Sequence, residues 1–126
     1  MNSKLTKVFE LVTEVIERNP DNNSETFSVS ENRGIIPQRL LFKKQIAKDD
    51  RSKYRCINYG DVIYNPYLLW NGAVGVCFSR EGGCVSPAYV VLRPFHKGTE
   101  RFLHYFFRSP MFVAEVDAMA TGTVTG

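Results

Sequence analysis

Residues 60–65, Gly-Asp-Val-Ile-Tyr-Asn, and residues 73–78, Ala-Val-Gly-Val-Cys-Phe, decide the fold of this chain. Each is a short apolar run bounded by turn-forming residues, a pattern typical of buried strands. The same criteria predict strands at residues 54–57 and 84–93, the second broken by a proline. The turn at residues 80–83, Arg-Glu-Gly-Gly, joins two of these runs as a β-hairpin would.

Helical patterns lie on both sides of this β-rich region. Apolar residues recur at three- and four-residue steps over residues 3–18, which predicts an amphipathic helix that ends before Pro20. The same spacing predicts helices at residues 100–108 and 110–119, the second with Ser109 as its N-cap. We therefore expect a single α+β domain, a twisted and mostly antiparallel sheet flanked by an N-terminal helix and two C-terminal helices.

Two extended segments precede the central strands. Phe27 and Val29 alternate with serines, which predicts a short strand running into a loop at residues 31–34. Residues 35–37, Ile-Ile-Pro, are expected to be extended because the residue before a proline avoids the helical region. Residues 40–42, Leu-Leu-Phe, fit either a strand or a short helix.

The length and composition exclude several classes of protein. The chain has 126 residues, of which 44% are hydrophobic, enough for one core and too many for a globally disordered chain. The longest apolar runs fall far short of the roughly 20 residues that span a bilayer. Glutamates interrupt the only candidate leader segment, so the expected location is the cytoplasm.

The net charge of +3 conceals an uneven distribution. Residues 1–32 are acidic and residues 56–126 are neutral, whereas residues 33–55 hold eight basic and two acidic side chains. Such a cluster is suited to phosphates, because Lys and Arg release the counterions of nucleic acid and Arg can read base edges. The alternative is a solvated face that only keeps the protein in solution.

The chain offers little for catalysis or metal binding. Its three cysteines, Cys56, Cys77 and Cys84, form no CxxC pair, which argues against a zinc site or a disulfide framework. A hairpin would bring Cys77 and Cys84 together, although small apolar residues in adjacent strands explain them better. The two histidines, His96 and His104, have no metal-ligand partner at useful spacing, and a small hydrolase would require a pocket at one of them.

Residues 64–72, Tyr-Asn-Pro-Tyr-Leu-Leu-Trp-Asn-Gly, form a polar and aromatic loop between two apolar strands. Asn65 and Asn71 carry amides that can pair with adenine, and Tyr or Trp can stack on a base or contact a thymine methyl. The structural alternative is that Trp70 covers the core while the two asparagines build turns beside Pro66 and Gly72.

Several motifs occur in a specific order over residues 26–126. They are Ser28-Val29, Arg33-Gly34-Ile35-Ile36-Pro37, Ser52-Lys53-Tyr54, Gly60 to Asn65, Trp70 to Val76, Val85 to Val91, and Gly122. Together they resemble the target recognition domain of type I restriction-modification DNA specificity subunits. The resemblance implies a non-catalytic module that reads one half of a bipartite double-stranded DNA site and guides methyltransferase and restriction (translocase) subunits to it.

The resemblance also implies which residues do what. The partner subunits would supply S-adenosylmethionine, ATP and magnesium, so this chain would bind no cofactor or metal. The DNA-contacting loops of the family correspond to the regions around residues 33–44 and 64–71. The candidate DNA-binding residues are Arg33, Arg39, Lys43, Lys44, Lys53, Tyr64, Asn65, Tyr67, Trp70 and Asn71. Residues matching the family's shared framework are Gly60, Asp61, Gly72, Gly75, Ser86, Pro87 and Tyr89.

The chain departs from the family in one respect. A full specificity subunit has two recognition domains, each followed by a spacer helix, whereas residues 1–126 correspond to one domain without that helix. We expect its parts to be the helix at 3–18, a basic loop and β-rich region at 26–93, and helices at 99–120. The alternative is a truncated fragment that serves as a protein-interaction module for a methyltransferase subunit or a second copy of itself, through its aromatic C-terminal helices.

Overall fold

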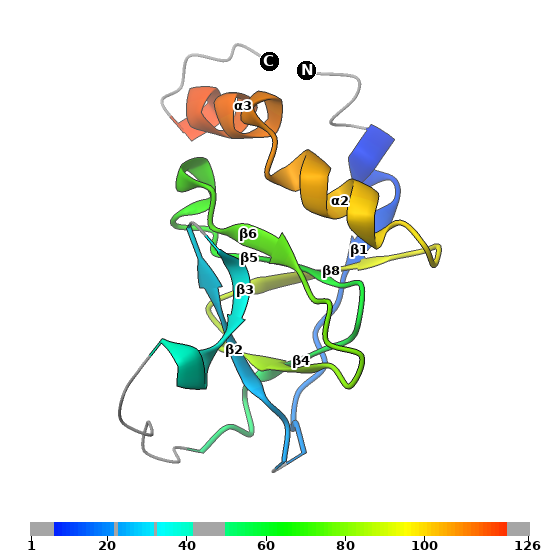
Figure 1. Ribbon diagram of the computed structural model, residues 1–126, viewed down its shortest axis with the longest axis vertical. Helices are drawn as coiled ribbons and strands as arrows, with labels where there is room; N and C mark the ends of the chain where they lie inside the picture. The colour runs from blue at the N-terminus through cyan, green and yellow to red at the C-terminus, as the bar shows by residue number, and fades with distance from the viewer. Residues whose placement is uncertain (1–6, 22, 32, 42–49, 121–126) are drawn as a thin grey trace.

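The computed structural model describes residues 7–21, 23–31, 33–41 and 50–120. Within these residues, eight strands form two four-stranded sheets (Figure 1). Sheet A has the order β1 (Val12–Glu14), β8 (Val90–Pro94), β5 (Val62–Tyr64) and β6 (Val74–Val76). Sheet B has the order β3 (Gly34–Pro37), β2 (Thr26–Ser30), β7 (Gly83–Val85) and β4 (Arg55–Ile57). The predicted α+β class is confirmed, but the strands divide between two sheets.

All of the strand pairs are antiparallel except the pair of β2 with β7, which is parallel. The strands predicted around Phe27 and Val29 and within 54–57 are confirmed with small shifts of their ends, and the segment expected to be extended at 35–37 lies in strand β3. Residues 40–42 were expected to form either a strand or a short helix. Leu40 is the last residue of the 3-10 helix η1 (Gln38–Leu40), so the structure agrees with the short helix at this residue.

The two predicted C-terminal helices are confirmed as α2 (Glu100–Phe107) and α3 (Pro110–Ala120). The Ser109 hydroxyl accepts a hydrogen bond from the amide of Phe112 at 3.2 Å, which is the expected N-cap contact. Helix α2 packs on sheet A through Leu103 and Phe107, one helical turn apart and both buried. Phe102, which precedes Leu103 in the chain, is 53% exposed.

Sheet A is the middle layer of the molecule, with the helices on one side and sheet B on the other (Figure 1). Successive side chains of a strand point to opposite faces, and β5 shows this alternation. Val62 packs with Leu103 and Phe107 beneath the helices, whereas Ile63 packs with Phe27 and Val85 of sheet B. Because both faces are covered, β5 is apolar throughout, which explains the continuous run that predicted it.

The two sheets come into close backbone contact at two glycines, Gly75 of β6 and Gly34 of β3. A Cβ atom on Gly75 of β6 would lie 3.0 Å from the Gly34 Cα atom and 3.0 Å from the Ile35 amide nitrogen of β3. Gly34 itself has a φ of 70°, a conformation that favours glycine. Because neither residue has a side chain, the turn between β2 and β3 can lie directly against sheet A.

The helix predicted at residues 3–18 is wrong over most of its described part. Residues 7–9 are helical, but Val12–Glu14 form strand β1, in which Val12 lies opposite Pro94 and Glu14 opposite Leu92. The edge of β8 presents backbone groups that need hydrogen-bond partners, and β1 supplies them. Tertiary pairing thus overrides the local helical period, which leaves Ile16 56% exposed.

The predicted hairpin at residues 80–83 is also wrong. The turn is tight, with the Gly82 amide bonded to the Ser79 carbonyl at 3.0 Å, but β6 before it pairs with β5 while β7 after it pairs with β4 and β2. The turn therefore carries the chain from sheet A to sheet B. As a consequence Cys77 and Cys84 do not lie in adjacent strands, although both are buried free thiols.

Candidate nucleic-acid interface

The described parts of the two segments predicted to bind DNA meet beside α3, which packs on η2 (Leu69–Asn71) of the second segment (Figure 1). The turn between β2 and β3 and the loop between β5 and β6 lie side by side there, and we call this region the tip, defined by residues 31, 33 and 65–72. The Asn71 amide nitrogen of η2 (Leu69–Asn71) donates a hydrogen bond to the Glu31 carboxylate. Gly72 follows with a φ of 84°, and a Cβ there would lie 3.3 Å from the Glu31 carbonyl oxygen. This contact fixes the two loops to each other.

The loop at 65–72 is held internally by its asparagines and its backbone. The Asn65 side-chain oxygen accepts a hydrogen bond from the Tyr67 amide at 2.9 Å, which is an Asx turn. The backbone amides of Leu68 and Asn65 bond to the carbonyls of Asn65 and Ala73, each at 3.0 Å. Asn65 thus holds the turn, as the structural alternative expected, whereas Asn71 makes a contact with Glu31 that neither interpretation predicted.

The aromatic candidates of this loop have different surroundings. Tyr64 is half-buried against the core under the helices, and burial followed by the nearby Glu14 carboxylate raises the pKa of its hydroxyl. Tyr67 is 79% exposed. The side chain of Trp70 lies outside the described part of the structure. Tyr67 is therefore the aromatic side chain that the described tip offers to a ligand, and Tyr64 is part of the fold.

Two arginines flank the tip. Arg33 is exposed in the turn, where its amide donates to the Ser30 hydroxyl at 3.2 Å. Arg108, at the end of α2, donates from Nη1 to the Val74 carbonyl at 2.9 Å and lies 3.2 Å from the position of a Cβ on Gly34. Sequence reasoning missed Arg108, because nothing in a local pattern indicates that the end of α2 reaches the turn between β2 and β3.

Two further candidates, Arg39 and Lys53, lie in described residues of the basic segment outside the tip, and we call this pair the basic flank. Arg39 pairs with Glu25 at 2.9 Å with 66% of its side chain exposed, and Lys53 is exposed. Lys43 and Lys44 lie outside the described residues. Arg33 precedes strand β3 and Arg39 lies in η1 after it, so the two lie beyond opposite ends of this strand. The described candidates therefore form two groups, the tip and this basic flank, rather than one cluster.

Two basic residues of the same segment face the protein. Arg51 Nη1 donates to the Ser24 carbonyl and to the Thr26 hydroxyl, both at 2.9 Å. Arg55 is half-buried in β4, 3.6 Å from the Glu14 carboxylate. These two side chains hold sheet B to its surroundings, so fewer cations of the segment are available to phosphates than its composition indicates.

The framework residue Asp61 forms a buried ion pair with Arg93. Asp61 is 1% exposed, and its two carboxylate oxygens accept hydrogen bonds from Arg93 Nε at 3.0 Å and Nη2 at 2.9 Å. The Asn58 amide also donates to it at 2.8 Å, and Arg93 reaches Glu17 as well. The bonds to Asp61 raise the pKa of Arg93, so this charge is fully committed to the fold.

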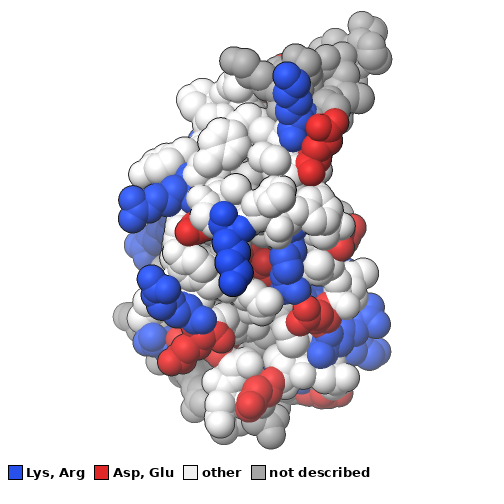
Figure 2. Space-filling view, turned by 90° about the vertical axis from the view of Figure 1, so that its right-hand side faces the viewer, with Lys and Arg blue, Asp and Glu red and all other residues white. Residues whose placement is uncertain are grey.

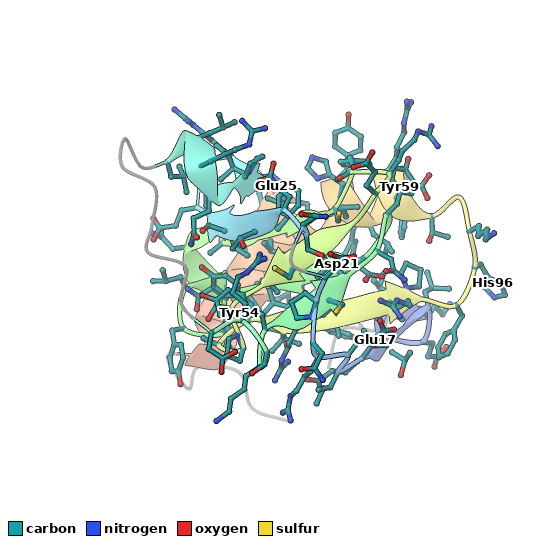
Figure 3. The ribbon with its side chains drawn as sticks, turned by 90° about the horizontal axis from the view of Figure 1, so that it is seen from below. Glu17, Asp21, Glu25, Tyr54, Tyr59 and His96 are labelled. Atoms are coloured by element: carbon teal, nitrogen blue, oxygen red, sulfur yellow. The ribbon has the colours of Figure 1, made fainter. Side chains whose placement is uncertain are left out.

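An open hollow of about 640 Å³ lies on the opposite side of the molecule from the basic flank. Figure 3 shows His96 near this side, far from Glu25 and Tyr54. Basic and acidic groups both line the hollow, among them Arg80, Lys97, Glu81 and Glu100. Figure 2 shows the same mixture of signs over this face. A mixed surface does not produce the single-sign field that attracts a polyanion.

The two histidines lie in different environments. His96 is exposed in the loop before α2, whereas His104 is half-buried between Phe78 and Tyr105, with ring centroids 5.4 Å from each. Burial, and then the charge of Arg108, lower the pKa of His104. Among the residues that the structure describes, no group of three or more His, Cys, Asp and Glu side chains can hold a metal ion.

No protein-family model matches the chain, and a search of curated proteins finds no match. Of the helices in the described residues, none has the length and apolar character needed to cross a membrane.

Proposed function

We propose that this chain is a sequence-specific double-stranded DNA-binding module that reads one half of a bipartite restriction-modification target. The observation that carries the proposal is the tip, where exposed Arg33 and Tyr67 stand on loops joined through Asn71 and Glu31. A loop that is already held in place loses little backbone freedom on binding, which favours specific contacts. The motif order that resembles a type I target recognition domain supports the same function.

The basic flank suits the second part of such an interface. Phosphate contacts position a protein on the duplex, and base contacts specify the sequence. Arg39 and Lys53 are exposed cations outside the tip, and Arg33 and Tyr67 are at the tip. We assign the first pair to phosphates and the second to base edges. Catalysis, with S-adenosylmethionine, ATP and magnesium, belongs in this proposal to methyltransferase and restriction partners.

Titration of duplex DNA at several salt concentrations tests the proposal. Arg51 and Arg55 contact the protein, so about four contacts from the remaining cations are expected, and log affinity should fall with log salt at a slope of about −4. Selection of bound sites from a random duplex pool should enrich one short sequence. Absence of binding to any duplex, or an affinity that does not change with salt, would overturn the proposal.

A second function has one specific observation in its favour, the exposed aromatic side chains on and beside α2. Phe102 is 53% exposed, Tyr105 is 73% exposed, and neighbouring Phe78 is 45% exposed. Aromatic residues are enriched in protein interfaces, so this face suits docking on a methyltransferase subunit or on a second copy of the chain. Mass measurement during size exclusion, combined with the DNA titration, separates the two functions, since self-association without DNA affinity favours docking.

A further inference from the structure

Cys56 and Cys84 lie directly opposite each other on neighbouring antiparallel strands of sheet B. The register of β4 and β7 pairs Arg55 with Val85, Cys56 with Cys84, and Ile57 with Gly83. Directly opposite residues project from the same face of a sheet, so the two thiols share one side of sheet B.

Backbone hydrogen bonds show which kind of pair this is. The Cys56 amide donates to the Glu17 carbonyl at 2.7 Å, and the Cys84 amide donates to the Glu25 carbonyl at 2.8 Å. Both amides therefore point away from the partner strand, as in a non-hydrogen-bonded pair. Such pairs place their Cα atoms about 4.5 Å apart, within the roughly 4.4–6.8 Å range of disulfides.

The two sulfurs differ in accessibility. Cys84 is fully buried, with its sulfur 3.5 Å from the Thr26 hydroxyl and 3.5 Å from Arg51 Nη1. Cys56 is half-buried and its sulfur contacts the Arg18 carbonyl at 3.7 Å near the surface. Burial first, and then the Glu17 carboxylate, raise the pKa of the Cys56 thiol, so alkaline pH should speed its reaction.

We propose that Cys56 and Cys84 form a reversible cross-strand disulfide when the chain meets a small-molecule disulfide such as oxidised glutathione. The accessible Cys56 thiolate attacks one sulfur of that disulfide, whose S–S bond breaks and releases one glutathione thiolate. The Cys84 thiolate then attacks the Cys56 sulfur of the mixed disulfide and releases the second. Two protein thiols are oxidised, one glutathione disulfide is reduced to two thiols, and the released thiolates take up the two protons.

The bond connects oxidation to the basic segment. Its formation draws the Cys84 sulfur toward Cys56 and away from Arg51, a residue that also anchors the start of β2 through Ser24 and Thr26. Oxidation therefore changes one contact of a basic-segment side chain, whether or not the chain binds DNA.

The test compares disulfide formation in the folded chain and in urea, in glutathione buffers of fixed ratio. A Cys77→Ala variant is the starting protein, because trypsin leaves Cys56 and Cys77 in one peptide, residues 56–80, and Cys84 in another, residues 81–97. Intact mass should show the loss of two hydrogens, and the two peptides should be linked. The native register holds the two thiols close together. The equilibrium constant for forming the disulfide from oxidised glutathione should therefore be about tenfold higher or more in the folded chain than in urea.

Matched variants check the assignment. Adding Cys56→Ser to Cys77→Ala should abolish the linked peptides, and alkylation of Cys56 before oxidation should do the same without a second substitution. A stable glutathione adduct on Cys56 without linked peptides would overturn the proposal. So would an exchange equilibrium no more favourable in the folded chain than in urea.

Discussion

Arg93 and Arg33 carry the same guanidinium group in opposite surroundings. Arg93 reaches from β8 to Asp61, a carboxylate that is 1% exposed, and to Glu17. Arg33 stands exposed in the turn between β2 and β3. The comparison teaches that the position of a cation in the fold, and not its residue type, decides whether it stabilises the protein or is available to a polyanion. Sequence charge counts treat the two side chains alike.

The largest expected effect comes from breaking the buried pair. Asp61→Ala leaves Arg93 without its main partner and should lower the free energy of unfolding by about 3 to 5 kcal/mol. Urea denaturation measures this change. Glu81→Ala, which removes an exposed carboxylate, is the matched control and should change stability by about 0.5 kcal/mol or less. A similar decrease in the free energy of unfolding in both variants would contradict the distinction between buried and exposed charges.

Removing the exposed arginine should produce the reverse pattern. Arg33→Ala should weaken binding to the selected duplex by about 1 to 3 kcal/mol, with little effect on random duplexes. Its free energy of unfolding should stay within about 0.5 kcal/mol of the unsubstituted chain. Fluorescence anisotropy on both duplexes, with urea denaturation, measures the two quantities. Equal weakening on both duplexes would show that Arg33 contacts phosphate only.

Lys53 sharpens the contrast between reading bases and contacting phosphates. Lys53→Ala should weaken binding to all duplexes alike, and the slope of log affinity against log salt should become less negative by about 0.9. Lys97→Ala, a lysine at the mixed-charge hollow, is the control and should leave the slope unchanged. Identical slopes for Lys53→Ala and the unsubstituted chain would remove Lys53 from the interface.

The smallest expected effect concerns His104, whose charge depends on pH, and its contribution to the free energy of unfolding. Burial and Arg108 lower the pKa of His104 below its unfolded value of about 6.5, so the unfolded chain binds more protons between the two values. This contribution to stability is present above about pH 6.5 and is lost as the pH falls below it. Urea denaturation between pH 7.5 and 5.5 should show a shallower decline in His104→Gln. Equal declines would exclude His104 as the source.

Short sequence patterns predicted the strands that are buried on both faces and the helices that begin with a capping residue. The run at 62–64 reads as a strand because both of its faces are apolar, and Ser109 with Pro110 predicts the start of α3. The segment at Val12–Glu14 escaped prediction because its apolar spacing fits a helix, while the edge of β8 required a strand.

The candidate site was predicted in part. The sequence indicated both loops of the tip, the basic segment and, as one of two alternatives, the turn at Asn65, but not that Asn71 bonds to Glu31. The type of a side chain determines which hydrogen bonds it can make, but it does not determine which partner it bonds to in the folded protein. For the same reason the charge count of residues 33–55 includes Arg51 with the other cations, although this side chain bonds to the Ser24 carbonyl.

The sequence by itself determined the α+β class, the central strands and the C-terminal helices, because apolar periodicity and capping residues act over a few positions. Only the tertiary structure decided that the strands form two sheets, that the turn at 80–83 crosses between them, and that Cys56 faces Cys84. Strand pairing depends on backbone groups far apart in the chain, and a local pattern carries no record of which strand satisfies them.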